Sequence, residues 1–382
     1  MSRYLFVVPP FPSHIFPTIA IGRELTRRGH EVAWVTYAAM RRVLPAGATF
    51  FALDSPISQA MATEIHHQAG AAWMAGMKVL FEQVVMPLAR DMLPGVEAAI
   101  ESFRPDALVV DQQTVAGALA ARKRNLPWAT SAPTAALIHD KFTAFPKVEE
   151  WIVSLFDRLQ RDAGVEPVRW PDRSPALVLI YMSRSFCGTD VDFPAHYRFV
   201  GPALEGRPED VDFPWEQLRA GRRIFVSLGT LLAYRGERFF RAVTEAFAGM
   251  PIQVIVHAPS EFIPAPPENF IVRPWVPLLQ LLPKLDAIVC HAGTTVNEGF
   301  MHAIPAVLAP VAFDQSIFAE RAVASGAALR VQFGRVTPAQ LRESVLEILD
   351  NPSYRSAARI VQASFLDAGG APAAASAIEQ LR

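Results

Sequence analysis

The segment that spans residues 286–315 reads DAIVCHAGTTVNEGFMHAIPAVLAPVAFDQ. Its first apolar run, Asp286 to Cys290, is typical of a short buried strand, and a helical pattern follows a turn of small residues. A second apolar run, Pro305 to Ala309, leads to the polar pair Asp314-Gln315. This order of strand, turn, helix and strand predicts half of a doubly wound parallel sheet. Ligands bind beyond the carboxyl ends of such strands, where the polar residues after both runs would lie.

These polar residues suit an anionic ligand. A helix that begins at Thr294-Thr295 presents free backbone N–H groups and the positive end of its dipole, which favour phosphate. Gly293 allows the backbone to approach a ligand closely, and His291 can add an N–H donor. Asp314 and Gln315 offer the acceptors and the amide that recognise sugar hydroxyl groups. Phosphate recognition beside sugar recognition indicates a nucleotide sugar as ligand.

Two of these positions also have a structural interpretation. Thr295 and Glu298 have the spacing of a capping box, so capping and ligand contact are both open for Glu298. An isolated histidine at a strand end, such as His291, would more often be structural. Packing alone does not ask for so many polar groups at one strand end, and this favours a binding site.

Length and composition set the broader class. With 382 residues the chain is long enough for two domains. The net charge of −1 gives no electrostatic case for nucleic-acid binding. The two cysteines, Cys187 and Cys290, are far apart in sequence, so we expect no disulfide framework and a cytoplasmic location. Hydrophobic residues make up 51% of the chain, but no apolar run has the length of a transmembrane segment, and peripheral membrane contact stays open.

The amino-terminal half begins like another doubly wound sheet. Tyr4 to Val8 predicts a strand buried on both faces. Pro17 is expected to open a helix that ends near Arg28 with Gly29 as its cap, and Glu31 to Thr36 predicts the next strand. No Gly-x-Gly-x-x-Gly motif follows the first strand, so a dinucleotide cofactor is not expected.

His14 and Asp111 form a candidate pair in this half. His14 lies in the loop expected after the first strand, and Asp111 closes the predicted strand Ala107 to Val110. The carboxyl ends of parallel strands share one edge of a sheet, so the two side chains can meet there. An aspartate that holds one ring nitrogen makes the other a general base. Alone, His14 would more often be structural and Asp111 a helix N-cap.

The sequence divides into four parts: residues 1–205, a linker at 206–222 rich in Pro, Gly and charge, residues 223–365, and a terminal helix at 366–382. Two Asp-x-Asp pairs, at 190–192 and 210–212, lie in loop or linker composition. We interpret them as surface acids, and no metal site is predicted.

Three stretches together resemble the donor-site signature of GT-B glycosyltransferases: Arg273 to Pro277, Cys290 to Glu298, and Asp314-Gln315. The resemblance is to the family that contains the bacterial macrolide and carotenoid glucosyltransferases and the plant secondary-product enzymes. The His-to-Glu turn is one residue shorter than is usual there, and Leu278 replaces a usual Gln. The family fold is two Rossmann-like domains facing across a cleft, with the last helix crossing back to the first domain.

The resemblance implies a role for each matching residue. Trp275 would stack on the base and Val276 would read its edge, while Glu298 would hold the ribose. The diphosphate would be held by Ser227, Thr230, His291 and the Gly293-Thr294-Thr295 turn, and the transferred sugar by Asp314 and Gln315. His14 would be the general base, oriented by Asp111.

Two apolar, aromatic-bearing segments, one within residues 55–103 and one within 133–162, correspond to the family's acceptor pocket. Stripes of Met and aromatic residues usually form core, yet a Met-rich wall also suits a lipophilic ligand. The resemblance therefore implies an acceptor site with a greasy aglycone. Its candidate residues are Trp73, Met77, Phe81, Phe142 and Phe145.

We therefore predict a metal-independent, inverting transferase that moves a hexose from a UDP- or TDP-linked sugar to a hydroxyl of a lipophilic natural-product aglycone. A nucleotide-sugar epimerase on the same scaffold is one alternative, and it would consume donor with no acceptor present. A non-catalytic partner of another transferase is a second, and it would not need the His14–Asp111 pair. A lipid-bound enzyme that acts on a membrane pigment is a third.

Overall fold

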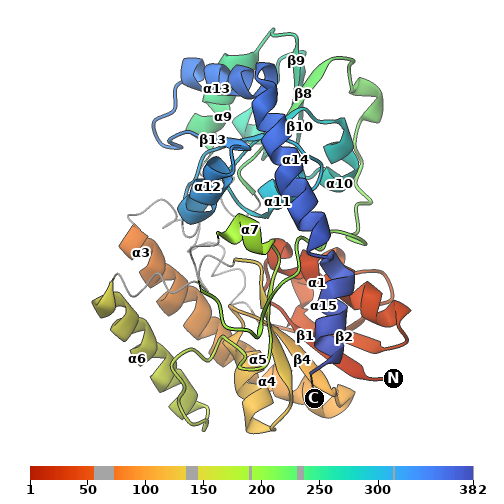
Figure 1. The fold of residues 1–382 in the computed structure, drawn as a ribbon, viewed down its shortest axis with the longest axis vertical. Helices are drawn as coiled ribbons and strands as arrows, with labels where there is room; N and C mark the ends of the chain where they lie inside the picture. Colours follow the sequence, from red (N-terminus) through yellow and green to blue (C-terminus); the bar gives the residue numbers. More distant parts are fainter. Residues whose placement is uncertain (56–72, 135–144, 189–191, 230–235, 313–314, 382) are drawn as a thin grey trace.

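The computed structural model describes residues 1–55, 73–134, 145–188, 192–229, 236–312 and 315–381. Two α/β domains lie one above the other, each built on a parallel sheet (Figure 1). The strands of the first sheet end at Phe199 and those of the second begin at Arg222, on either side of the predicted linker. The domain boundaries themselves stay predictions.

The first domain has, within the described residues, a seven-stranded sheet in the order β3-β2-β1-β4-β5-β6-β7. Tyr4 and Phe6 face one side of this sheet and Leu5 and Val7 the other, and all four are buried. This double burial explains the unbroken apolar run of β1. The strands are β1 Arg3–Val7, β2 Glu31–Tyr37, β3 Thr49–Leu53, β4 Ala107–Asp111, β5 Trp128–Ala132, β6 Val178–Ile180 and β7 Tyr197–Phe199.

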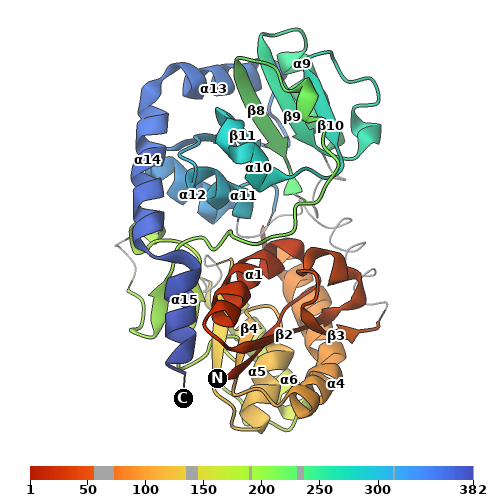
Figure 2. The ribbon, with the colours of Figure 1, turned by 90° about the vertical axis from the view of Figure 1, so that its right-hand side faces the viewer.

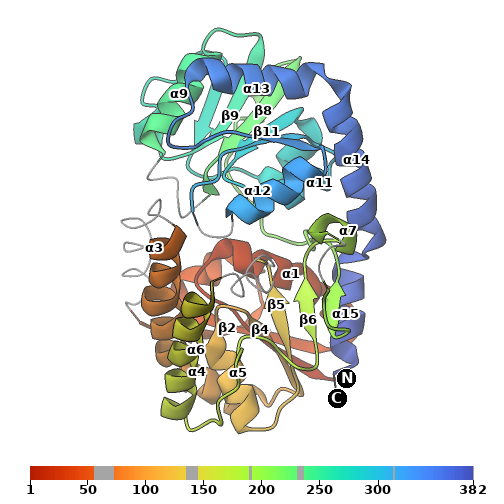
Figure 3. The same cartoon turned by 60° about the vertical axis from the view of Figure 1, so that its left-hand side comes forward.

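Helices cover both faces of the first sheet. Helices α3, α4 and α6 gather on one side of the domain (Figure 3), and a π-helical segment, Val79–Val85, joins α3 to α4. The helices are α1 Pro12–Arg27, α3 Trp73–Lys78, α4 Met86–Phe103, α5 Val115–Lys123, α6 Pro146–Asp162 and α7 Arg184–Cys187.

The start of α1 differs from the prediction. The helix begins at Pro12, where a missing N–H is harmless, and the carbonyl of Phe11 accepts the N–H of His14 at 2.9 Å. Pro17 lies inside the helix instead of opening it, and it removes one backbone hydrogen bond. His14 therefore lies in the first turn of a helix and not in a loop. The predicted end was correct, because Gly29 follows the helix with φ +89°.

The second domain has, in the described part, a six-stranded parallel sheet in the order β10-β9-β8-β11-β12-β13. Its strands are β8 Arg222–Ser227, β9 Ile252–His257, β10 Phe270–Arg273, β11 Ala287–Cys290, β12 Ala306–Leu308 and β13 Ala328–Arg330. Its helices are α9 Glu237–Phe247, α10 Leu278–Leu281, α11 Thr294–Phe300, α12 Gln315–Ala324, α13 Pro338–Asp350 and α14 Pro352–Asp367.

The last helix, α15 Gly370–Glu379, returns to the first domain. Figure 2 shows α14 beside the second domain and α15 lying along α1. Glu379 binds Arg28 through a 2.7 Å ion pair and His30 through a 2.9 Å hydrogen bond. The carboxyl end of the chain therefore joins the two halves. In the described residues, no helix has both the length and the apolar character required to cross a membrane.

Both sheets reverse their strand order at one point, between β1 and β4 in the first and between β8 and β11 in the second. Such switch points leave a crevice at the carboxyl ends of the strands. His14 and Asp111 lie at the first switch point, and Ser227 and His291 lie at the second.

Candidate functional site

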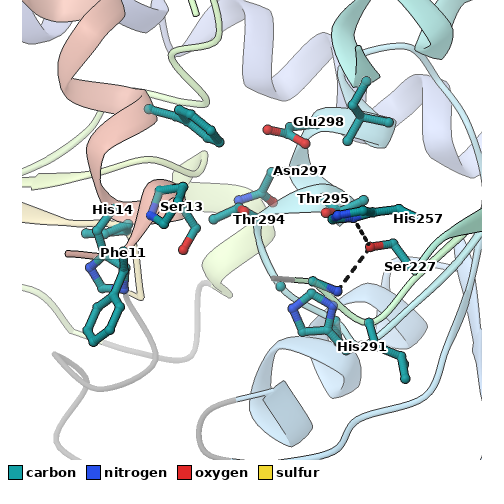
Figure 4. A pocket seen from close by; sticks show the side chains of 18 of the residues that line it. Phe11, Ser13, His14, Ser227, His257, His291, Thr294, Thr295, Asn297 and Glu298 are labelled. Atoms are coloured by element: carbon teal, nitrogen blue, oxygen red, sulfur yellow. Dashed lines mark hydrogen bonds between the residues drawn. The ribbon is translucent and has the colours of Figure 1, made fainter. Parts of the chain in front are cut away.

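The two switch points open into one cleft between the domains, with an empty volume of about 1560 Å³. His14 lines it from the first domain, and Ser227, His257 and His291 line it from the second. Figure 4 shows the side chain of His14 on one side and these three on the other, with Glu298 along the edge between them. The cleft therefore brings together side chains from opposite halves of the chain.

His14 and Asp111 are in contact. Nδ1 of His14 lies 2.9 Å from Oδ2 of Asp111, and the aspartate side chain is fully buried. The other carboxylate oxygen, Oδ1, accepts the backbone N–H of Gln113 at 2.9 Å. Asp111 does not cap helix α5, whose N-cap is Thr114. Both oxygens of Asp111 are thus engaged, and the carboxylate holds the imidazole in one orientation.

Ser227 connects the polar groups of the donor-side wall. It is the last residue of β8, and its hydroxyl oxygen accepts the backbone N–H of Gly229 at 3.0 Å. The same hydroxyl lies 3.1 Å from Nδ1 of His257, which ends the neighbouring strand β9. The ring of His257 meets that of Trp275 edge-on, with centroids 5.8 Å apart. Two adjacent strand ends thus form one polar wall.

His291 lies between two glycines. A Cβ atom added to Gly229 would come within 2.7 Å of the ring carbon Cε1, and one added to Gly293 would also collide with the ring. Gly229 has φ +72°, a conformation that glycine adopts without strain. Ala292 has φ +66°, a left-handed conformation that is strained for a residue with a side chain. The turn after β11 therefore holds the imidazole tightly.

Both donor-side histidines are neutral at neutral pH. Burial lowers the pKa of His257 to about 4, against a smaller upward influence from the backbone of Pro274. Burial also lowers the pKa of His291 to about 4, and the nearby His257 acts in the same direction. A neutral imidazole offers one N–H, so each ring is a hydrogen-bond donor without a permanent charge.

The Trp275 stretch lines the same cleft, as the resemblance implies. Trp275 is half-buried at the surface of the cleft, and Val276 and Leu278 are buried beside it. A half-buried indole beside a buried aliphatic wall suits a flat heterocycle. The base-stacking role of Trp275 and the edge contact of Val276 remain proposals.

Glu298 does not form the capping box. Helix α11 has Gly293 as its N-cap without a side-chain cap, and Oε1 of Glu298 instead binds the guanidinium of Arg207 at 2.6 Å. Thr294 and Thr295 stand in the first turn of α11, and their side chains line the cleft. Helix α11 is short, so the local N–H groups of this turn contribute more than the dipole of a long helix.

Gln315 lines the cleft but its carbonyl oxygen is occupied. Oε1 accepts the backbone N–H groups of Val311 and Ala312 at 2.8 and 3.1 Å, which fixes the orientation of the amide. Thr230 and Asp314, which were also predicted to contact the nucleotide sugar, lie outside the described residues.

The predicted acceptor residues are placed differently. Met77 and Phe81 are buried in the core of the first domain, and the Phe81 ring packs edge-on against Phe156. The neighbouring Leu80 and Val84 line the cleft, because the π-helical segment turns them toward it.

Three candidates for the acceptor site remain. Phe145 is 49% exposed at the start of α6. Phe142 and the side chain of Trp73 lie outside the described residues. An acceptor role for the five predicted residues therefore stays a prediction.

His257 and Arg207 are among the cleft-lining residues that the sequence analysis did not select. His257 ends strand β9 and could have been found by the same strand-end reasoning that selected His291. Arg207 lies in the linker, where nothing in the local pattern distinguishes it from surface arginines. Among the described residues, no group of three His, Cys, Asp or Glu side chains is arranged to hold a metal ion.

Comparisons with known proteins agree with this geometry. Residues 215–367 match the family model described as UDP-glucoronosyl and UDP-glucosyl transferase. The chain is 25% identical to an uncharacterized UDP-glucosyltransferase, YdhE, of Bacillus subtilis, over 96% of this chain and 94% of that protein. It is 28% identical to the 4'-demethylrebeccamycin synthase of Lentzea aerocolonigenes, over 93% of each.

A solved structure agrees as well. The calicheamicin glycosyltransferase CalG4 superposes with a TM-score of 0.79 at 26% identity, over 99% of this chain and 98% of that one. The likeness covers both domains and the cleft between them. The chain therefore has the GT-B fold of a glycosyltransferase that uses a nucleotide sugar, and residues 215–367 resemble the UDP-glucoronosyl and UDP-glucosyl transferase family.

Proposed function

We propose that the chain transfers a hexose from a UDP- or TDP-linked sugar to a hydroxyl group of a lipophilic small molecule, with inversion at the anomeric carbon. The observation that carries the proposal is the 2.9 Å contact between His14 and Asp111 at the edge of a cleft whose opposite wall is polar. The acceptor class is supported by the relatives, whose names include a demethylrebeccamycin synthase and a calicheamicin glycosyltransferase.

In this mechanism His14 is the general base. The carboxylate of Asp111 accepts the Nδ1–H of His14, which leaves Nε2 without a proton and free to accept one. Nε2 removes the acceptor hydroxyl proton as that oxygen attacks the anomeric carbon. The bond from this carbon to the diphosphate oxygen breaks on the opposite face, so the configuration inverts.

The donor wall stabilises the departing nucleoside diphosphate. The backbone N–H groups of the Gly293–Thr295 turn, the hydroxyl groups of Thr294 and Thr295, and the imidazole of His291 all line this side of the cleft. N–H and O–H donors fixed in a partly dry cleft stabilise negative charge as it develops. Because these donors are held by their own backbone, little reorganisation accompanies bond cleavage.

The acceptor side is apolar. Phe11, Leu80, Val84 and Pro133 line the cleft from the first domain, near His14. Apolar walls with few polar groups favour a lipophilic ligand, and the polar groups then select which hydroxyl is presented.

The first test is binding. Calorimetric titration with UDP and TDP should show saturable binding, and mass spectrometry with a panel of phenols and lipophilic alcohols should detect a hexose adduct. The anomeric coupling constant of the product, measured by NMR, tests inversion. Donor turnover in the absence of any acceptor would instead support an epimerase.

The second test is the base. His14→Ala should lower turnover by about 10²–10⁴-fold while the affinity for UDP is retained. His196→Ala is the matched control, since this histidine lies before β7 and does not line the cleft. A His14→Ala variant with wild-type turnover would contradict the mechanism.

A further inference from the structure

A buried charge cluster lies where the linker meets the cleft. The guanidinium of Arg207 binds Glu298 at 2.6 Å through one terminal nitrogen and Glu209 at 2.8 Å through the other. The exposed fractions of the three side chains are only 8%, 6% and 9%. All three residues line the cleft. A residue of the linker is thus part of the cleft in which we propose that the nucleotide sugar binds.

The same arginine contacts the first domain. Its guanidinium lies over the ring of Phe16, 4.5 Å from the centroid, and Phe16 belongs to α1 two residues after His14. Glu209 in turn accepts the backbone N–H groups of Leu279 and Gln280, in the first turn of α10. Arg207 therefore links the helix of the proposed base to Glu298 and, through Glu209, to helix α10.

The cluster carries two carboxylates and one guanidinium. Desolvation acts to lower the pKa of Arg207, but Glu298 and Glu209 outweigh it and the pKa is raised, so the cation is retained. The other titratable groups near Glu298 are Cys290 and His302. Burial raises the pKa of the Cys290 thiol to about 12 and lowers the pKa of His302, so neither is charged at neutral pH. Arg207 is thus the counter-ion of Glu298.

We propose that Arg207 is a positioning residue of the donor site: it fixes Glu298 as an acceptor for a ribose hydroxyl of the donor, and it offsets part of the negative charge of the two carboxylates before the anionic diphosphate enters. The inference rests on the proposed function, because it needs a nucleotide-sugar donor in this cleft. Oε1 of Glu298 faces Arg207, and no hydrogen bond from the described residues engages the other oxygen, Oε2, which would accept from a ribose hydroxyl. Without the guanidinium, two carboxylates would face the diphosphate at close range, and like charges in a partly dry site repel strongly.

The test is calorimetric titration of UDP against Arg207→Met, Arg207→Lys and the wild-type chain. Arg207→Met should weaken UDP binding by roughly tenfold or more near pH 8. The loss should shrink as the pH falls toward about 5, because protons then neutralise the unpaired carboxylates. Arg207→Lys keeps the charge and should recover most of the affinity. Arg219→Met is the matched control, since this linker arginine pairs with Glu268 on the surface.

A second variant separates charge from structure. Glu209→Gln keeps one acceptor oxygen, for the backbone N–H of Leu279, gives up the 3.1 Å contact with the N–H of Gln280 and removes one negative charge. UDP should therefore bind as tightly as to the wild type or more tightly. Weaker binding by Glu209→Gln would contradict the electrostatic role. A pH-independent loss in Arg207→Met without rescue by Arg207→Lys would show that the cluster is only structural. If the wild-type chain binds neither UDP nor TDP, the proposed function itself fails.

Discussion

The two neutral histidines of the donor wall make the stability of the fold dependent on pH. His257 and His291 have pKa values of about 4 in the folded chain, against 6.5 for an unperturbed histidine. Between these values the unfolded chain binds protons that the folded chain does not. The free energy of unfolding therefore rises with pH over this window. The contribution of the two neutral histidines to the free energy of unfolding is fully present above pH 6.5 and is lost as the pH falls toward about 4.

The size of the effect follows from the shift. One pKa unit corresponds to 1.36 kcal/mol, so a fall from 6.5 to about 4 is worth on the order of 3 kcal/mol for each ring. Both residues are partly exposed at the cleft, so solvent screening makes this an upper value. The two rings influence each other, and their losses are not expected to be independent.

The assay is urea unfolding followed by tryptophan fluorescence, at several pH values from about 8 to about 4.5. The free energy of unfolding of the wild-type chain should fall by several kcal/mol across this range. In the His257→Gln variant the fall should be roughly half as large. The comparison with the variant is needed because His196 and His302 also have lowered pKa values through burial. A His257→Gln variant whose pH profile parallels that of the wild type would refute the reasoning.

The same argument predicts proton uptake when the donor binds. A diphosphate placed beside a neutral imidazole favours its protonated form, so UDP binding should draw protons from the buffer below about pH 6. Calorimetric titration in two buffers with different ionisation enthalpies measures this uptake. Identical apparent enthalpies in both buffers would mean that His291 stays neutral in the complex.

Two further outcomes are expected. Gly229→Ala places a methyl group 2.7 Å from the ring of His291 and strains a backbone at φ +72°. The affinity for UDP, measured by calorimetric titration, should therefore fall by about tenfold or more. An unchanged affinity would show that Gly229 does not hold the ring in place. Glu379→Ala removes the contacts of α15 with Arg28 and His30, so the chain should lose roughly 1 kcal/mol of stability in thermal unfolding, and an unchanged midpoint would mean that α15 is held by its apolar face alone.

Sequence reasoning was strongest where one local pattern carried the information. The apolar runs at Tyr4 to Val8 and Asp286 to Cys290 are strands because only a strand buried on both faces shows such runs between small-residue turns. The contact between His14 and Asp111 followed from the rule that parallel strands end at one edge of a sheet.

It was weaker where distant segments compete for one group. Thr295 and Glu298 have capping-box spacing, but a buried arginine outweighs a backbone N–H as partner for a carboxylate. Met77 and Phe81 belong to a pattern that usually forms core but also suits a pocket, and spacing along the chain could not show that both side chains pack into the core of the first domain.

The sequence by itself determined the strands of the two parallel sheets and the polar residues at the strand ends, because periodicity and turn chemistry are local properties. Tertiary structure alone decided that Arg207 of the linker would bind Glu298, and that His257 and His291 would lie deep enough to lose their charge. The physical reason is that desolvation and ion pairing depend on which surfaces meet. No spacing along the chain records how deeply a side chain will be buried.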